Sequence, residues 1–176
     1  LRALGVEPNA GSRAHFYVGQ TEVALSGMTP RPGAAETLRA LRAGGLHVGV
    51  VSNIDDDQFG ALWNHCGLDP LVDATTTSEQ ARSCKPDADI FHAALAKAGP
   101  LRPEDVVFVG DSVPHDVAGA NALGMTSVLI EDLTSDSAHA HPPAHVISDL
   151  RQLVGIALDA ASAAGSGPLA REDAPS

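Results

Sequence analysis

The sequence predicts an α/β fold in which helices cover both faces of a mostly parallel sheet, giving three layers. Short apolar runs rich in valine and isoleucine alternate along the chain with stretches of about ten residues that have helical periodicity. Glycines follow several of the helical stretches, as they do at helix C-termini. Strands that alternate with helices are joined by crossover connections, so the strands are expected to run parallel.

The expected elements follow one another at short intervals from Thr29 onward. Strands are expected at residues 46–51, 71–75, 106–109, 127–130 and 146–147. Helices are expected at residues 34–43, 55–66, 86–98, 114–123 and 150–160, the third with Pro86 at its first helical position. Residues 162–176 are mainly small, polar and charged, and are expected to form a disordered tail.

The composition is that of one ordinary domain and argues against several classes of protein. The 176 residues are enough to bury a core, and no apolar run approaches the roughly 20 residues that span a bilayer. A net charge of −11 argues against a general binder of nucleic acid or of anionic membranes. The two cysteines, Cys66 and Cys84, provide no disulfide framework, and a reducing cytoplasm is the expected setting.

One stretch combines a strand, a turn and two acidic side chains. Residues 106–109 are typical of a strand buried on both faces, and Gly110 permits a sharp turn at its end. Asp111 and Asp116 then place two oxygen donors near one point, and Mg²⁺ prefers such ligands. The alternative is that Asp111 or Ser112 only caps the following helix and that Asp116 lies on its solvated face.

Further polar residues are expected at the same edge of the sheet. Ser52 and Asn53 follow one strand, Lys85 precedes a helix, and Asp111 follows another strand. Ligands of open parallel sheets gather at the carboxyl ends of the strands. A hydroxyl, backbone amides, a lysine and two carboxylates together suit a phosphate group with a divalent metal ion. Taken singly, Ser52 also suits a turn or helix cap, and Lys85 an ordinary surface lysine.

Three segments resemble motifs of a known family. They are VGVVSN (48–53), CKPDADIF (84–91) and VFVGDSVPHDV (107–117). In order, spacing and structural context they resemble three of the four motifs of the haloacid dehalogenase-like hydrolase superfamily. The resemblance covers about residues 30–150 and implies a Rossmann-like core, with a helical cap inserted between the first and second motifs.

The resemblance implies a role for each candidate residue. Ser52 would bind phosphate through its hydroxyl, Asn53 would help to shape the substrate pocket, and Lys85 would steady the nucleophile and the phosphoryl oxygens. Asp111 would bind the metal, and Asp116 would act on it directly or through water. Phosphatases of this family need Mg²⁺, whereas its dehalogenases work without a metal, and the Gly-Asp-Ser-x-x-x-Asp pattern resembles the metal-dependent branch.

The family's first motif is not found before Ser52. That motif is an Asp-x-Asp after an apolar strand, and its first aspartate is the nucleophile of the family. The same spacing occurs at residues 55–57 and 87–89, but both segments open helices after the second motif and are rejected as nucleophiles. The strand that carries the first motif lies between the strands ending at Ser52 and Asp111, so its absence would leave two strand edges unpaired.

The chain is therefore expected to be the C-terminal part of a longer protein. Residues 1–29 would be a remnant of the cap and residues 30–161 the core. The expected activity is Mg²⁺-dependent hydrolysis of a small phosphorylated metabolite through an aspartyl-phosphate, with the nucleophile upstream and this chain inactive alone. Neither nucleic acid nor membrane is an expected partner, and the sequence carries no signal for an oligomeric state.

Two other functions stay open at this point. The first keeps the fold and changes the reaction, to that of a haloacid dehalogenase or a phosphonate-cleaving relative. The second is a non-catalytic remnant that binds a phosphorylated ligand or a partner through Ser52 and Lys85.

Overall fold

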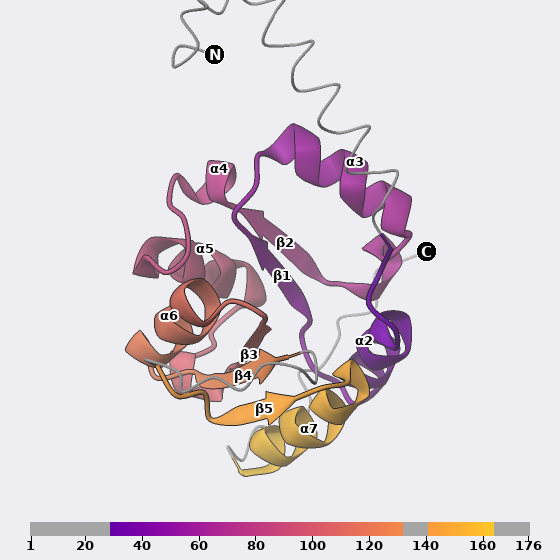
Figure 1. Ribbon diagram of the computed structural model, residues 1–176, viewed down its shortest axis with the longest axis vertical. Coiled ribbons are helices and arrows are strands. Elements are labelled where there is room, and N and C mark those ends of the chain that lie inside the picture. The colour runs from indigo at the N-terminus through magenta and orange to yellow at the C-terminus, as the bar shows by residue number, and fades with distance from the viewer. Residues whose placement is uncertain (1–28, 132–140, 164–176) are drawn as a thin grey trace, which may run out of the picture.

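The expected alternation of strands and helices is present in the computed structural model, which describes residues 29–131 and 141–163 (Figure 1). The strands are Gly49–Ser52 (β1), Ala74–Thr77 (β2), Val107–Gly110 (β3), Thr126–Ile130 (β4) and His145–Ile147 (β5). The α-helices are Ala34–Ala43 (α2), Asp56–Cys66 (α3), Ser78–Ala81 (α4), Ala88–Ala98 (α5), Ala118–Ala122 (α6) and Leu153–Ala163 (α7). The cap remnant expected at residues 1–29 lies outside the described residues, apart from Thr29.

The strands form two parallel sheets. β1 pairs with β2, with Val50 opposite Thr75, and the second sheet has the order β3-β4-β5, with Val109 opposite Val128. Among the described residues, no strand pairs with the second edge of β1 or with the second edge of β3. The sheet is thus interrupted between the strands that end at Ser52 and Gly110, where the sequence predicts that a central strand is missing.

Helices cover both faces because successive side chains of a strand point to opposite sides. Val107 and Val109 of β3 pack against a core cluster that includes Leu41 of α2 and Leu153 of α7. Phe108, between them, packs against a second cluster formed around α5 and α6. Figure 1 accordingly shows α2 and α7 on one side of β3-β4-β5 and α5 and α6 on the other. The predicted three-layer α/β architecture is confirmed.

β3 is less buried than the sequence predicts. The sequence predicts that residues 106–109 are covered on both faces, but each of them is only half-buried. β4 has a strand on each side, and its Val128 and Leu129 are almost completely buried. The difference follows from the neighbours, since one edge of β3 has no strand beside it in the described part of the chain.

Two helices begin differently from the prediction. α5 starts at Ala88 after Asp87, whose backbone is extended, so Pro86 does not occupy the first helical position. The helix expected from residue 114 begins with a π-helical turn, Val113–Val117, before α6. In this turn the Ser112 carbonyl accepts the backbone N–H groups of residues 116 and 117, at 2.7 and 3.2 Å. Single π-turns of this kind frequently lie at functional sites.

The remaining boundaries shift by a few residues. The expected strand at 71–75 begins at Ala74, because Asp69–Leu71 forms a 3₁₀ turn. α7 continues to Ala163, so residues 162 and 163 are helical, whereas residues 164–176 of the expected tail lie outside the described residues. In the described parts of the chain, no helix has the length and apolar character needed to cross a membrane.

The turn before α7 makes a pH-dependent contribution to stability. The Asp149 carboxylate accepts the backbone N–H of Arg151 at 2.9 Å and also pairs with its guanidinium group. Hydrogen bonding from the Arg151 side chain lowers the pKa of Asp149 from 3.8 to about 2. Because folding lowers this pKa, the contribution is complete above about pH 4 and is lost as the pH falls toward 2.

We therefore expect D149N to be less stable than the wild type near neutral pH, by an amount that shrinks in acid. The measurement is urea denaturation of both proteins between about pH 6 and pH 2. A difference in the free energy of unfolding that stayed constant over this range would contradict the assignment.

Candidate active site at the strand ends

The Lys85 side chain joins the end of β1 to the segment that follows β3. Its ammonium group donates to the carbonyl of Val51 in β1 at 3.1 Å and lies 2.7 Å from Asp116 Oδ1, beyond the end of β3. The same ammonium group is 5.8 Å from the centre of the Phe108 ring. The Lys85 and Asp116 side chains are only 13% and 6% exposed. One largely buried ion pair thus connects the two sheets across the interruption.

Asp116 has partners for both carboxylate oxygens. Oδ1 pairs with Lys85, and Oδ2 accepts the backbone N–H of Ser112 at 3.0 Å. The side chain lies directly against Gly110, where an added Cβ atom would come within 2.2–2.4 Å of three Asp116 atoms. Glycine is therefore required at residue 110 for this close approach. The alternative of an Asp116 on a solvated helix face is wrong, because the residue is buried.

Asp111 lies in the open part of the site. Its side chain is 66% exposed, and its Oδ2 atom is 3.4 Å from Nη2 of Arg31. The neighbouring Ser112 precedes the π-helical turn without capping it through its side chain, and its Oγ lies instead 2.8 Å from Nδ1 of His115. The capping alternative is therefore wrong for Ser112. Arg31 is a site residue that sequence reasoning missed, since it belongs to none of the three motifs.

Ser52 and Asn53 have different surroundings at the end of β1. Ser52 is the last residue of the strand and lies opposite Thr77 of β2. Asn53 holds the backbone of Lys85 at two points, because its Nδ2 donates to the Lys85 carbonyl at 3.0 Å and its Oδ1 accepts the Lys85 N–H at 2.7 Å. The structure thus brings Asn53, Lys85 and Asp116 together. Ser52 directly precedes Asn53 in the chain.

At the start of α3, Asp56 is hydrogen-bonded to residues at the end of β2 and in α4. The hydroxyl of Thr77, which is fully buried, donates to the carboxylate of Asp56. The backbone N–H of Asp56 donates in turn to Glu79 at 2.8 Å. These bonds attach the start of α3 to the end of β2. Sequence reasoning did not predict the role of Thr77, but it did place the segment 55–57 at the start of a helix, and this is confirmed.

The donors at the strand ends suit a metal ion that is held mostly by water and substrate. Within residues 29–131 and 141–163, no three His, Cys, Asp or Glu side chains gather closely enough to enclose a metal. Mg²⁺, however, usually takes one or two protein carboxylates and completes its shell with water and phosphate oxygens. Asp111 is accessible for such an ion, and each Asp116 oxygen keeps a lone pair beyond its present partner.

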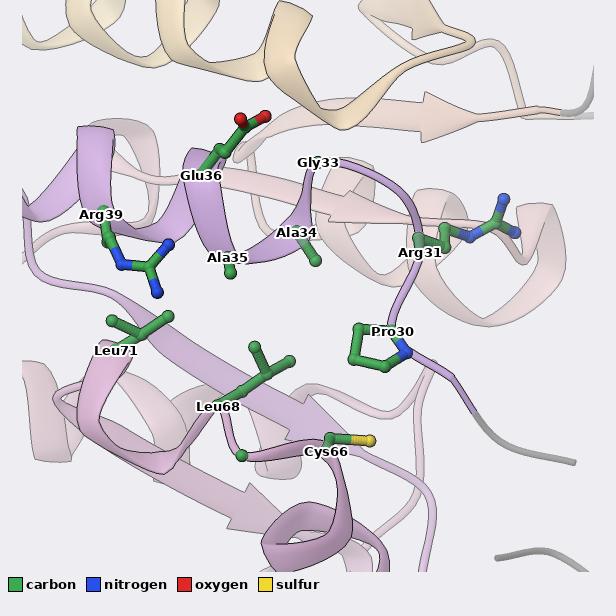
Figure 2. A pocket seen from close by; sticks show the side chains of 11 residues that line it. Pro30, Arg31, Gly33, Ala34, Ala35, Glu36, Arg39, Cys66, Leu68 and Leu71 are labelled. Atoms are coloured by element: carbon green, nitrogen blue, oxygen red, sulfur yellow. The ribbon is translucent and has the colours of Figure 1, made fainter. Parts of the chain in front are cut away.

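A pocket of about 270 Å³ lies elsewhere, between α2 and the end of α3 (Figure 2). Arg39, Leu68 and Leu71 point toward one another across it, whereas Glu36 points away. None of the candidate site residues at the strand ends lines this pocket. Arg31 stands at its edge, and its guanidinium group points away from the pocket.

The fold and the residues at its strand ends define a class, a parallel α/β protein with a polar site at the carboxyl edge of the sheet. The family model described as haloacid dehalogenase-like hydrolase matches residues 2–124. The chain therefore belongs to the haloacid dehalogenase-like hydrolases, and the resemblance carried by the three motifs is confirmed.

Known proteins of this family extend the comparison. The haloacid dehalogenase-like hydrolase domain-containing protein 3 of Xenopus laevis is 36% identical over 124 residues, which are 70% of this chain and 50% of that protein. A glyceraldehyde 3-phosphate phosphatase of Methanocaldococcus jannaschii is 32% identical over 131 residues, 73% of this chain and 57% of that protein. The crystal structure of a phosphatase of this family from Thermococcus onnurineus superimposes with a TM-score of 0.70 at 25% identity, covering 87% of this chain and 66% of that one. The chain thus spans about half the length of the curated relatives it matches.

Proposed function

We propose that the protein containing this chain is a Mg²⁺-dependent phosphatase that acts on a small phosphorylated metabolite. The observation that carries the proposal is the position of the Lys85 ammonium group between the end of β1 and Asp116. A cation at the carboxyl edge of a parallel sheet suits a phosphate group. Support also comes from the phosphatase activity named for the Methanocaldococcus relative.

Each residue has a distinct task in this proposal. The hydroxyl of Ser52 and the ammonium group of Lys85 bind phosphoryl oxygens, and Lys85 also offsets their negative charge. Asp111, which is exposed, and Asp116, which is fixed against Gly110, would hold the metal ion. Bound Mg²⁺ would reduce the repulsion between the phosphate and an attacking carboxylate.

The nucleophile in this proposal is an aspartate outside the 176 residues, and the reaction passes through an aspartyl-phosphate. The first aspartate of the chain is Asp55, which follows the second motif. It precedes α3, where Asp56 is bonded to Thr77, and Asp87 and Asp89 lie at the start of α5. Each of these aspartates lies at the start of a helix and none comes directly after a strand, so none occupies the position that the family uses for the nucleophile.

We expect the 176-residue chain alone to have no phosphatase turnover. The test compares it with the product of the complete reading frame that contains it, using p-nitrophenyl phosphate and a panel of small sugar phosphates with and without Mg²⁺. The complete product should hydrolyse phosphate esters only with Mg²⁺, and K85A should lower its kcat/KM by about 100-fold or more. Hydrolysis by the 176-residue chain would contradict the assignment of the nucleophile.

Two further measurements on the complete product distinguish the phosphatase from the two other functions. Halide release from a 2-haloacid without added metal would assign the dehalogenase reaction instead. Binding of inorganic phosphate by the complete product without any turnover would favour a non-catalytic binding protein. Either result would overturn the phosphatase proposal.

A further inference from the structure

We propose that Asn53 is a positioning residue for Lys85, an inference that rests on the proposed function of this site. The resemblance implies that Asn53 helps to shape the substrate pocket. In the structure, its carboxamide is instead engaged with the backbone of the lysine. Asn53 then affects the reaction indirectly, because by holding the Lys85 backbone it sets where the ammonium group lies.

The two hydrogen bonds of the Asn53 carboxamide go to the same residue. Oδ1 accepts the Lys85 N–H at 2.7 Å, and Nδ2 donates to the Lys85 carbonyl at 3.0 Å, both within the normal range. A carboxamide offers an acceptor and a donor along one edge, which matches the N–H and C=O of a single residue. Asn53 therefore holds Lys85 as a neighbouring strand would, although the two residues are 32 positions apart.

Both the backbone and the ammonium group of Lys85 are bound to β1 or to the residue directly after it. Its backbone is held by Asn53, directly after the strand, and its ammonium group donates to the carbonyl of Val51, the next-to-last residue of the strand. The ammonium group must also reach Asp116 Oδ1 at 2.7 Å, which lies beyond β3 in the other sheet. A lysine side chain is flexible, so the position of its backbone relative to β1 decides whether both contacts form together.

The composition of the chain provides an internal reference for a direct test. The sequence contains two lysines, Lys85 and Lys97. Lys97 lies on α5 and donates to the Thr75 carbonyl at 2.6 Å and to Gln80 Oε1 at 2.7 Å, and neither partner is Asn53. The 176-residue chain labelled with ¹⁵N-lysine therefore gives two side-chain ammonium resonances that NMR follows separately, with K97R and K85R assigning them.

The expected result is selective. N53A should move the Lys85 ammonium resonance to the position of a solvated lysine or broaden it away, because the backbone is no longer held, while the Lys97 resonance stays in place. N53D keeps the acceptor for the Lys85 N–H and loses the donor for its carbonyl, so it should cause a smaller change in the same direction. N64A, at an exposed asparagine of α3, should change neither resonance.

The contrary result is an unchanged Lys85 resonance in folded N53A, and it would overturn the proposal. Movement of both lysine resonances to the position of a solvated lysine would show that N53A does not fold, and the same comparison is then made with N53D. An unchanged Lys85 resonance in N53D, which keeps the size of the side chain, would overturn the proposal as well. This readout needs no turnover, so its outcome stands whether or not the phosphatase assay succeeds.

A kinetic comparison separates positioning from direct contact with substrate. In the complete reading-frame product, N53A should lower kcat/KM by about 10-fold to 100-fold, but by no more than about 2-fold when Lys85 is already alanine, since residues that act as a unit are not additive. Losses that multiply in the N53A/K85A double variant would assign Asn53 to the substrate and overturn the inference.

Discussion

Replacing Asp116 by alanine is expected to lower the free energy of unfolding by about 3–5 kcal/mol, the cost of leaving one partner of a buried ion pair alone. The Asp116 side chain is 6% exposed, and its carboxylate pairs with the ammonium group of Lys85 at 2.7 Å. Without it, the ammonium group of Lys85, whose side chain is 13% exposed, would lack its counter-ion. The backbone N–H of Ser112 would lose its acceptor too. Denaturation by urea at neutral pH measures the difference.

Asp111 provides the matched control for this prediction. It is five residues away in the same motif, but it is 66% exposed and its contact with Arg31 is 3.4 Å long. D111A should therefore change the free energy of unfolding by less than about 1 kcal/mol. Adding K85A to D116A should recover part of the loss, because no unpaired charge remains buried. Equal losses for D116A and D111A would show that the ion pair does not stabilise the fold.

Replacing Phe91 by alanine is the second change with a large expected effect, about 3–5 kcal/mol of stability. Phe91 lies on α5 and is 1% exposed. Its ring is 5.0 Å from that of Phe108 in β3, at an interplanar angle of 60°. It also fills the space beside Gly119 of α6, where an added Cβ atom would be 2.5 Å from the ring. F91A thus opens a cavity between three elements, and thermal or urea denaturation measures its cost.

Phe59 is the matched control for Phe91. It is half-buried on α3, and its ring stacks on that of Trp63 at 5.3 Å. F59A should cost about 1 kcal/mol, the range of such an aromatic pair. G119A should be destabilising in the wild type because of the Phe91 ring, and less so in F91A, where the ring is gone. A loss from F59A as large as that from F91A would contradict this description of the core.

The order of the elements was predictable because hydrophobic periodicity reports which face of a segment is buried. It identified the helix at residues 34–43 without error and placed each strand to within a few residues. The polar residues at the strand ends were also predictable, since parallel strands end at one edge of a sheet. The degree of burial of β3 was not, because it depends on which strands lie beside it, and periodicity carries no such information.

Contacts within the site were beyond sequence reasoning for a different reason. The bonds of Asn53 to Lys85 and of Arg31 to Asp111 join residues 32 and 80 positions apart. Which side chains meet depends on rotamers and on loop paths that no local pattern encodes. The π-helical turn before α6 was hidden in the same way, since residues 113–117 have no composition that separates a π-turn from an α-turn.

The contact between Gly110 and Asp116 has a consequence for how this sequence can diverge. A side chain at position 110 would occupy space that the carboxylate of Asp116 already fills. A larger residue there becomes acceptable only after Asp116 has been lost, and the loss of Asp116 first leaves Lys85 without its counter-ion. Each single step passes through a destabilised intermediate. Single substitutions at Gly110, Asp116 or Lys85 are therefore disfavoured. We expect the three residues to change together or to stay as they are.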